Sequence, residues 1–179
     1  MYKPKNFQMI VTVALLVVAA SCSLFQKNVH TPQTFELRID RPAGAALQFS
    51  VLKDVDTNTK ALQENAASRE SFSINSITYT VSDYSGDGDA VISGNIEFAL
   101  SGSSDFTVLD SITDLHLGKM EESGQENTIR LQDSAVEQKL AQLLQRGSMV
   151  TFRLNATTTD SPIAASLLVT IDAEMTVEL

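Results

Sequence analysis

The 179-residue chain contains one cysteine, two histidines and no tryptophan. A single cysteine excludes an intramolecular disulfide and any zinc site built from several cysteines. His30 and His116 stand far apart in the sequence and form no pair at metal-ligand spacing. Basic residues are also scarce, since 13 Lys and Arg face 22 Asp and Glu, for a net charge of -9. This balance argues against nucleic acid as a partner, because phosphate binding needs a basic surface.

The sequence also lacks the short motifs of common enzymes. It contains no G-x-S-x-G, no phosphate-binding G-x-x-x-x-G-K-[ST] and no H-E-x-x-H. With no tryptophan and only three tyrosines, a stacking surface for sugars has little support either. We therefore predict that the protein is not an enzyme.

The N-terminal segment has the pattern of a secretory signal peptide. Lys3 and Lys5 precede an uncharged, mostly apolar run at residues 9–20, and small residues lead from that run to Cys22. The twelve residues of this run are too few to span a bilayer core, which needs about 20. The segment therefore predicts export rather than a spanning helix.

The four residues Ala19, Ala20, Ser21 and Cys22 resemble the lipobox of bacterial lipoproteins. The resemblance covers residues 1–25 only, and Ala19 stands where that class usually has Leu, Val or Ile. It implies that the Cys22 sulfur receives a diacylglycerol, that the chain is cut before Cys22, and that the new N-terminus is acylated, for example with palmitate. Two other interpretations remain: an unmodified thiol after an ordinary signal peptide, and a 17-residue membrane anchor at residues 9–25.

These observations predict three parts in the chain. Residues 1–21 form the signal peptide, residues 22–33 a flexible tether without periodicity, and residues 34–179 a single domain. The expected location is the cell envelope, with the protein held by lipid in the outer membrane and facing the periplasm. No acidic run follows Cys22, so nothing in this segment indicates display on the outer surface.

The predicted domain is dominated by alternating apolar and polar residues, which is typical of half-buried strands. The longest alternation covers residues 167–179 at the C-terminus. Other alternating stretches lie at residues 35–39, 47–51, 72–74, 77–81, 96–100 and 150–156, with shorter candidates at 106–109, 112–119 and 128–132. We predict an all-β fold, an antiparallel β-sandwich of eight or nine strands. A closed β-barrel is the alternative.

Three local features interrupt the strand pattern. The alternation changes phase at Asn75 and Ser76, which predicts a bulge or a bend. Residues 134–146 predict one covering helix that begins with a capping box of Ser134 and Glu137 and ends before Gly147. Residues 57–69 fit a weaker helix or a solvated loop equally well.

The segment D-Y-S-G-D-G-D at residues 83–89 resembles the start of a calcium-binding loop. Asp83, Asp87 and Asp89 are the candidate ligands, because calcium prefers several hard oxygen atoms. The twelfth position of such a loop needs a bidentate Glu, and here it is Gly94. A hairpin loop built from turn-forming residues is therefore the favoured interpretation, and Ca²⁺ binding is the second.

Acidic residues are concentrated in the middle of the chain. Between residues 71 and 128 there are ten acidic residues and one base, Lys119. Such a charge is typical of a solvated surface, and it opposes docking onto anionic lipid, so the lipid at Cys22 would have to supply the attachment.

Together these patterns predict a membrane-anchored bacterial envelope lipoprotein with a structural or interaction role. Its partners would be the membrane, through Cys22, and an unidentified envelope protein. One alternative is a periplasmic carrier of an apolar ligand or lipid, which would need a pocket lined by apolar residues. The other alternative is a calcium-binding β-sandwich module.

Overall fold

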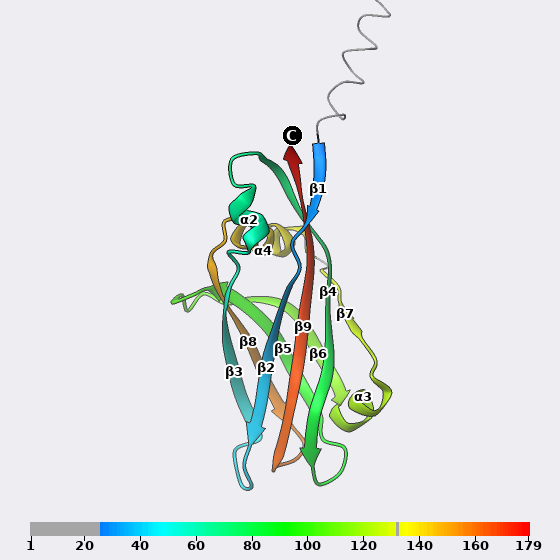
Figure 1. Ribbon diagram of the computed structural model, residues 1–179. Coiled ribbons are helices and arrows are strands. Elements are labelled where there is room, and N and C mark those ends of the chain that lie inside the picture. The colour runs from blue at the N-terminus through cyan, green and yellow to red at the C-terminus, as the bar shows by residue number, and fades with distance from the viewer. Residues whose placement is uncertain (1–25, 132) are drawn as a thin grey trace, which may run out of the picture.

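The computed structural model describes residues 26–131 and 133–179, which form two antiparallel sheets packed face to face (Figure 1). The strands are β1 Gln26–His30, β2 Gln33–Arg41, β3 Gln48–Asp56, β4 Arg69–Gly86, β5 Val91–Leu100, β6 Thr107–His116, β7 Asn127–Ile129, β8 Met149–Thr158 and β9 Ile163–Glu178. The helices are α2 Lys60–Glu64, α3 Leu117–Ser123 and α4 Ser134–Gln145. The predicted all-β sandwich is confirmed, as is its strand number.

Strand β9 is the centre of the larger sheet. Its C-terminal half pairs with β1 and its N-terminal half with β2, so that these two strands follow one another along the same edge. Strand β4 pairs with β9 along nearly its whole length on the other edge, and β7 adds to β4. The second sheet has the order β3-β8-β5-β6.

The alternative of a closed barrel is wrong. Within the described ranges, the strand pairings form two separate sheets, and no strand ladder joins them. In the part that the structure describes, the chain crosses between the sheets six times: loops connect β2 to β3, β4 to β5 and β8 to β9, and segments that contain α2, α3 and α4 connect β3 to β4, β6 to β7 and β7 to β8. A barrel needs continuous pairing around its wall, which these crossings do not provide.

The core lies between the facing sheets and follows the predicted alternation. On β2, Phe35, Leu37 and Ile39 are buried and the residues between them are exposed. The rings of Phe35 and Phe152, from opposite sheets, stack with their centroids 4.2 Å apart. Burial of each such side chain stabilises the fold by about 1.5–3 kcal/mol relative to its exposure to water. The alternation of β9 is confirmed as far as Val177, whereas Leu179 is 75% exposed.

The predicted tether at residues 22–33 is wrong from Gln26 onward. Residues 26–30 form β1, and β2 begins at Gln33. Strand β1 shows no apolar alternation, because only Val29 is partly buried and the other four residues are exposed. Pairing of its backbone with β9 therefore forms this strand, and such pairing leaves no periodicity in the sequence.

The predicted irregularity in the fourth strand is confirmed, because the register between β4 and β9 shifts between Ile74 and Ser76. The strand predicted at residues 112–119 is only partly right. It ends at His116, and residues 117–123 form α3. Leu117 and Met120 are both buried, and their spacing of three residues suits one face of a helix.

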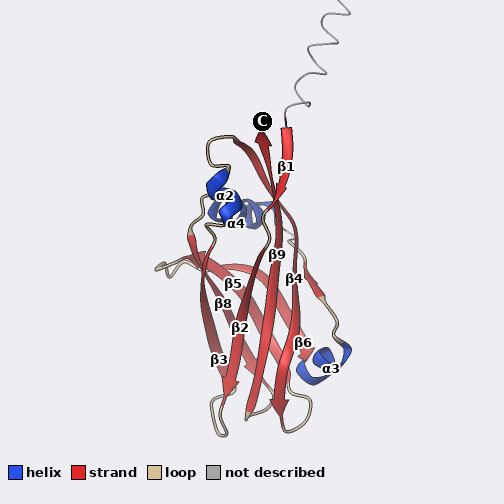
Figure 2. Cartoon of the chain, in the orientation of Figure 1, coloured by secondary structure: helices blue, strands red, loops and turns tan. Residues whose placement is uncertain are grey.

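Helix α4 confirms the predicted covering helix, with a correction at its start. The N-cap residue is Asp133, whose side chain accepts a hydrogen bond from the backbone N–H of Ala135; Ser134 is the first helical residue. At the other end, Gly147 has a φ of +64° and donates to the carbonyl of Leu144. Figure 2 shows α4 at the same end of the sandwich as α2, with α3 at the opposite end.

Residues 57–69, for which the sequence allows either a helix or a loop, form a loop that contains the short helix α2. Its buried Leu62 packs with Met175 and Val177 of β9 in a small apolar cluster, separate from the main core. This cluster lies where β1, β4 and β9 extend beyond the second sheet (Figure 1). None of the helices in the described ranges is long and apolar enough to cross a membrane.

The position of the α4 cap predicts a difference between two neighbouring substitutions. Asp133→Ala removes the side-chain acceptor and should lower the free energy of unfolding by about 1 kcal/mol. Ser134→Ala should change it little, since the Ser134 side chain does not cap the helix. Urea unfolding at neutral pH measures both, and a larger cost for Ser134→Ala would contradict the assignment.

Candidate functional site

The predicted lipidation site, Cys22, lies outside the described residues. The first described residue after it is Gln26, which opens β1. The geometry available for a functional site therefore belongs to the polar clusters of the folded domain.

The three candidate calcium ligands do not converge. Asp83 is exposed, with a φ of +54°, and Asp87 is exposed in the loop between β4 and β5. Asp89 is half-buried and turns toward α3. In the part of the chain that the structure describes, no group of three or more His, Cys, Asp or Glu side chains is arranged to hold a metal ion. The loop also joins two different sheets, so the predicted hairpin is wrong.

Asp89 instead caps helix α3 from a distant part of the chain. One oxygen, Oδ1, accepts hydrogen bonds from the backbone N–H of Gly118 at 3.1 Å and of Lys119 at 3.4 Å. The residue at the N-cap position, His116, makes no side-chain capping bond itself. Asp89 therefore supplies the acceptor that the first turn of the helix requires.

The second carboxylate oxygen of Asp89 binds two side chains. His116 Nδ1 lies 2.7 Å from Oδ2 and donates to it, since an ionised carboxylate only accepts. Lys119 Nζ lies 3.2 Å from the same oxygen. Desolvation raises the pKa of Asp89, but the hydrogen bonds from His116 and Lys119 lower it by more, so the pKa lies below its usual value. Asp89 is therefore ionised at neutral pH.

Tyr84 holds the segment between β4 and β5 in place beside Asp89. Its hydroxyl donates to the carbonyl of Gly88 at 2.6 Å and accepts from the N–H of Ala90 at 2.9 Å. Its backbone N–H donates to Glu121 of α3 at 2.9 Å. A surface hollow of about 360 Å³ remains beside these residues, lined by Tyr84, Gly88, Asp89, Gly118, Lys119, Glu121 and Glu122.

The arrangement of Asp89, His116 and Lys119 is suited to holding a helix rather than to chemistry. A carboxylate and an imidazole in contact recur in general-base catalysis, which also needs a nucleophile or a water within reach of the imidazole. The His116 ring donates from Nδ1 to Asp89, Lys119 Nζ lies 3.3 Å from the same ring nitrogen, and no other side-chain hydrogen bond of His116 is present among the described residues. Sequence reasoning missed the roles of His116 and Lys119; their spacing of three residues, one helical turn apart, was the available signal.

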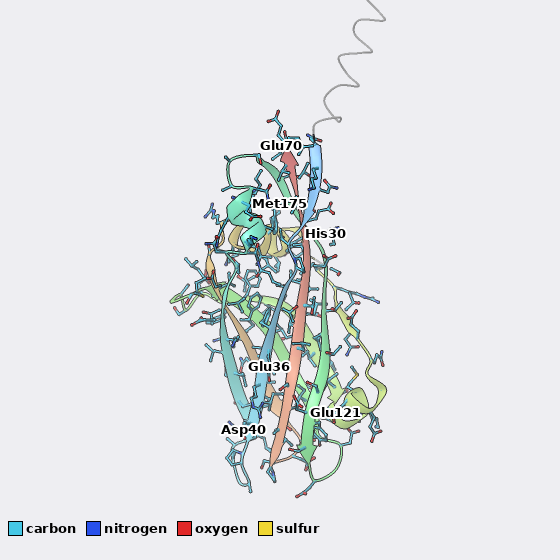
Figure 3. All side chains as sticks on the ribbon, viewed as in Figure 1. His30, Glu36, Asp40, Glu70, Glu121 and Met175 are labelled. Carbon is cyan, nitrogen blue, oxygen red and sulfur yellow. The ribbon has the colours of Figure 1, made fainter. Side chains whose placement is uncertain are left out.

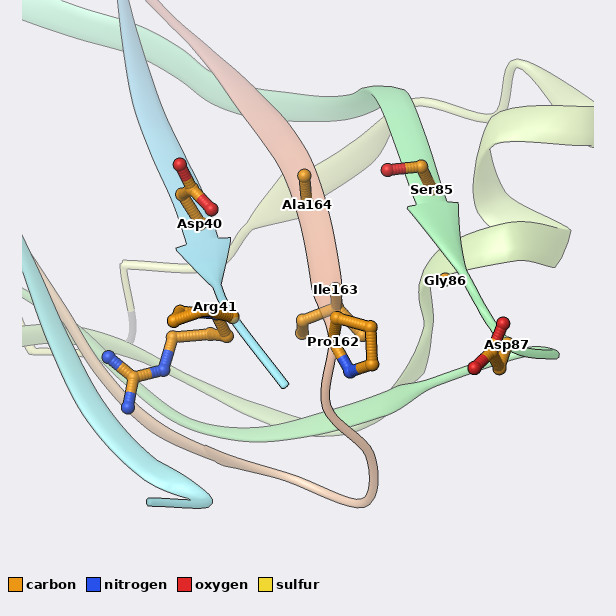
Figure 4. Close-up of a pocket in the computed structure, with 9 residues that line it drawn as sticks. Asp40, Arg41, Ser85, Gly86, Asp87, Pro162, Ile163 and Ala164 are labelled. Atoms are coloured by element: carbon orange, nitrogen blue, oxygen red, sulfur yellow. The ribbon is translucent and has the colours of Figure 1, made fainter. Parts of the chain in front are cut away.

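A second hollow, of about 350 Å³, lies at the same end of the sandwich, between the ends of β2, β4 and β9 (Figure 4). Asp40, Arg41 and Asp87 contribute its charged side chains. Figure 4 shows the Arg41 side chain directed away from Asp87. Its Nη2 donates to the carbonyl of Ala46 at 2.8 Å, and its guanidinium carbon lies 5.6 Å from the centre of the Phe49 ring. The Arg41 guanidinium is thus engaged with Ala46 and with Phe49 of β3, on the side of the hollow away from Asp87.

A charged pair with one buried member lies on the second sheet. Glu97 is only 7% exposed and forms an ion pair with Arg153 on the neighbouring strand. The Arg153 guanidinium lies 3.7 Å from the centre of the Phe106 ring. Arg153 thus binds Glu97 through the ion pair and Phe106 through the stacking contact. Since Phe106 directly precedes β6, these contacts hold that end of the loop against the sheet. Removal of one partner of such a pair is strongly destabilising, because the other charge stays buried.

Comparison with known proteins assigns no family to the chain. No family model matches, and no curated protein matches. Among solved structures, one of infectious bursal disease virus, Gt strain, matches over 86% of this chain and 33% of its own, with 10% identity and a TM-score of 0.32. The chain thus spans about a third of that protein's length.

Two other solved structures give similar values. That of desmodium yellow mottle tymovirus has 7% identity, a TM-score of 0.29 and coverage of 86% and 83% of the two chains. That of the decameric BFDV capsid protein has 9% identity, a TM-score of 0.31 and coverage of 84% and 98%. At these TM-scores, the similarities carry no argument about the function of this chain.

The role of Asp89 predicts a pH-dependent loss of stability. A lowered pKa means that the stabilisation is present above the usual aspartate pKa and is lost as the pH falls through the pKa of the folded state. Asp89→Asn should therefore lower the melting temperature at neutral pH, and the difference from wild type should vanish in acid. Thermal unfolding across a pH series measures this.

Asp87→Asn is the matched control, since Asp87 is exposed in the same loop. We expect it to leave the melting temperature unchanged at every pH. If the two variants behaved alike at neutral pH, Asp89 would not have the capping role assigned to it.

Proposed function

We propose that the protein is a lipid-anchored component of a bacterial cell envelope, held at the membrane through Cys22, with a β-sandwich domain of structural or interaction role. One observation carries the proposal: the only cysteine of the chain follows Ala19, Ala20 and Ser21 at the exit of a short apolar run. This arrangement resembles a lipobox, in which the cysteine is the residue that receives the lipid.

The energetics of lipid anchoring agree with this role for Cys22. Each buried methylene contributes about 0.8 kcal/mol, so one acyl chain gives marginal, reversible binding and two or three chains give stable attachment. A diacylglycerol on the sulfur and an acyl group on the new N-terminus would supply three chains. The proposed location is the outer membrane, facing the periplasm; SLFQK rather than an acidic run follows Cys22, so the sequence carries no signal for display on the outer surface.

The domain itself supports an interaction role more than catalysis. The polar side chains around Asp89 form their hydrogen bonds and ion pairs with groups of the domain itself. The partner would be another protein of the envelope.

The two alternatives find no supporting observation. A carrier of an apolar ligand needs free space in the core, whereas the Phe35 and Phe152 rings stack in direct contact across the two sheets. Calcium binding needs convergent oxygens, whereas Asp89 is already engaged with α3.

Metabolic labelling with a fatty acid analogue in a bacterial host tests the anchor. Wild type should incorporate the label and remain with the membrane fraction, because the sulfur of Cys22 is the attachment point. Cys22→Ser should lose the label and leave the membrane fraction. The mass of the purified protein should correspond to a chain that begins at Cys22 and carries lipid.

Cys22→Ala, which differs from the serine variant only by one hydroxyl oxygen, should behave in the same way as Cys22→Ser. Equal labelling of the wild type and both variants would overturn the proposal.

A further inference from the structure

The chain enters the folded domain at one pole of its long axis. Gln26, the first residue of β1, pairs with Glu178, the last residue of β9, and its side-chain amide donates to Glu70 of β4. Figure 3 shows Glu70, Met175 and His30 toward this end, and Asp40 and Glu121 toward the opposite one. We call residues 26–30, 57–74 and 173–179 the near end.

The connection between Cys22 and the near end is short. Only four residue steps separate Cys22 from Gln26, and four steps span at most about 14 Å even when fully extended. A tether of a dozen residues would let the domain tumble freely, but the structure places residues 26–30 in a strand. An anchored Cys22 would therefore keep the near end close to the lipid surface.

Strand β1 is firmly attached to the rest of the domain. All five of its residues pair in register with β9. Its partly buried Val29 packs on the cluster of Leu62, Met175 and Val177. On β9, Glu174 Oε2 lies 3.5 Å from His30 Nε2, and Asp172 Oδ1 lies 3.8 Å from His30 Nδ1. An anchor that holds β1 would thus also orient β9, the central strand of the larger sheet.

Charge is distributed unequally along this axis. The near end contains three basic and four acidic residues. The distal end, defined as residues 38–47, 82–93, 113–126 and 156–165, contains three basic and nine acidic residues. Anionic lipid headgroups repel the acidic distal end when it comes within roughly a Debye length, about 10 Å, of the membrane. The near end is nearly neutral, so the headgroups do not repel it.

From this geometry we propose that the anchored domain stands upright on the bilayer, with the near end facing the lipid headgroups and the distal end projecting away from them. The surface that the near end faces is a phospholipid bilayer. The sixteen residues of β9, at about 3.3 Å each, place the distal loops about 50 Å farther from the membrane. The inference rests on the lipid anchor of the proposed function.

Energy transfer from single labelled positions to acceptor-bearing lipids tests the orientation. Ala67→Cys, in the near end, and Ala43→Cys, in the distal end, are matched substitutions of exposed loop residues. The full-length chain is expressed in a bacterial host, purified as the lipidated protein and placed in vesicles of phosphatidylcholine and phosphatidylglycerol. Lipid on the Cys22 sulfur leaves the introduced cysteine as the only free thiol. Transfer should be several-fold higher from A67C than from A43C.

The outcomes separate the orientation from the anchor itself. Mass spectrometry of each preparation shows whether Cys22 carries lipid; a chain without lipid overturns both the proposed function and the orientation that rests on it. A lipidated protein with equal transfer from both positions, or more from A43C, overturns the orientation alone. Unchanged melting temperatures confirm that both variants are folded.

A lengthened connection tests the cause of the orientation. Insertion of about 15 Gly and Ser residues between Phe25 and Gln26 gives a flexible linker that removes the distance limit. In vesicles of phosphatidylcholine alone, where lipid charge does not contribute, this insertion should reduce the contrast between A67C and A43C toward equality. An unchanged contrast would contradict the role of the short connection.

Discussion

The structure depends on the backbone pairing of one strand, β9. Both of its edges are occupied, by β1 and β2 on one side and by β4 on the other. Its N-terminal half contributes Leu167, Val169 and Ile171 to the main core, and its C-terminal half contributes to the small cluster with Leu62. A slip of one residue in this register would turn the whole apolar set toward solvent, so burial of these side chains and pairing of the backbone specify the same arrangement.

The acidic loop after β4 shows how tertiary contacts change the meaning of a local pattern. From the sequence alone, the closely spaced aspartates favour a hairpin loop and leave a cation site as the second interpretation. In the folded chain, Asp89 meets the free N–H groups of α3 together with His116 and Lys119, while Asp83 and Asp87 face solvent. A negative charge near unpaired backbone donors and two basic side chains is already balanced. The carboxylate thus has a structural role that spacing within the loop does not reveal.

The position of β1 links the fold to the proposed anchor. A strand added to the edge of β9 converts most of the expected tether into part of the domain. The proposed membrane attachment at Cys22 would thereby be joined to the long axis of the sandwich through a few residues, and the excess negative charge lies at the other end. A surface presented to a partner in the envelope would then be the distal loops, which stand farthest from the lipid.

The amino-acid sequence by itself determined the elements whose buried face leaves a periodic pattern of apolar residues. The alternation in β2 and β9, the irregularity at Asn75 and Ser76 and the apolar stripe of α4 were all predicted, because burial of one face leaves a period in the sequence. Tertiary structure decided β1, the cap supplied by Asp89 and the pair of Glu97 and Arg153. Each of these depends on a partner far away in the chain, through backbone hydrogen bonds or charges, and such pairing leaves no local pattern to detect.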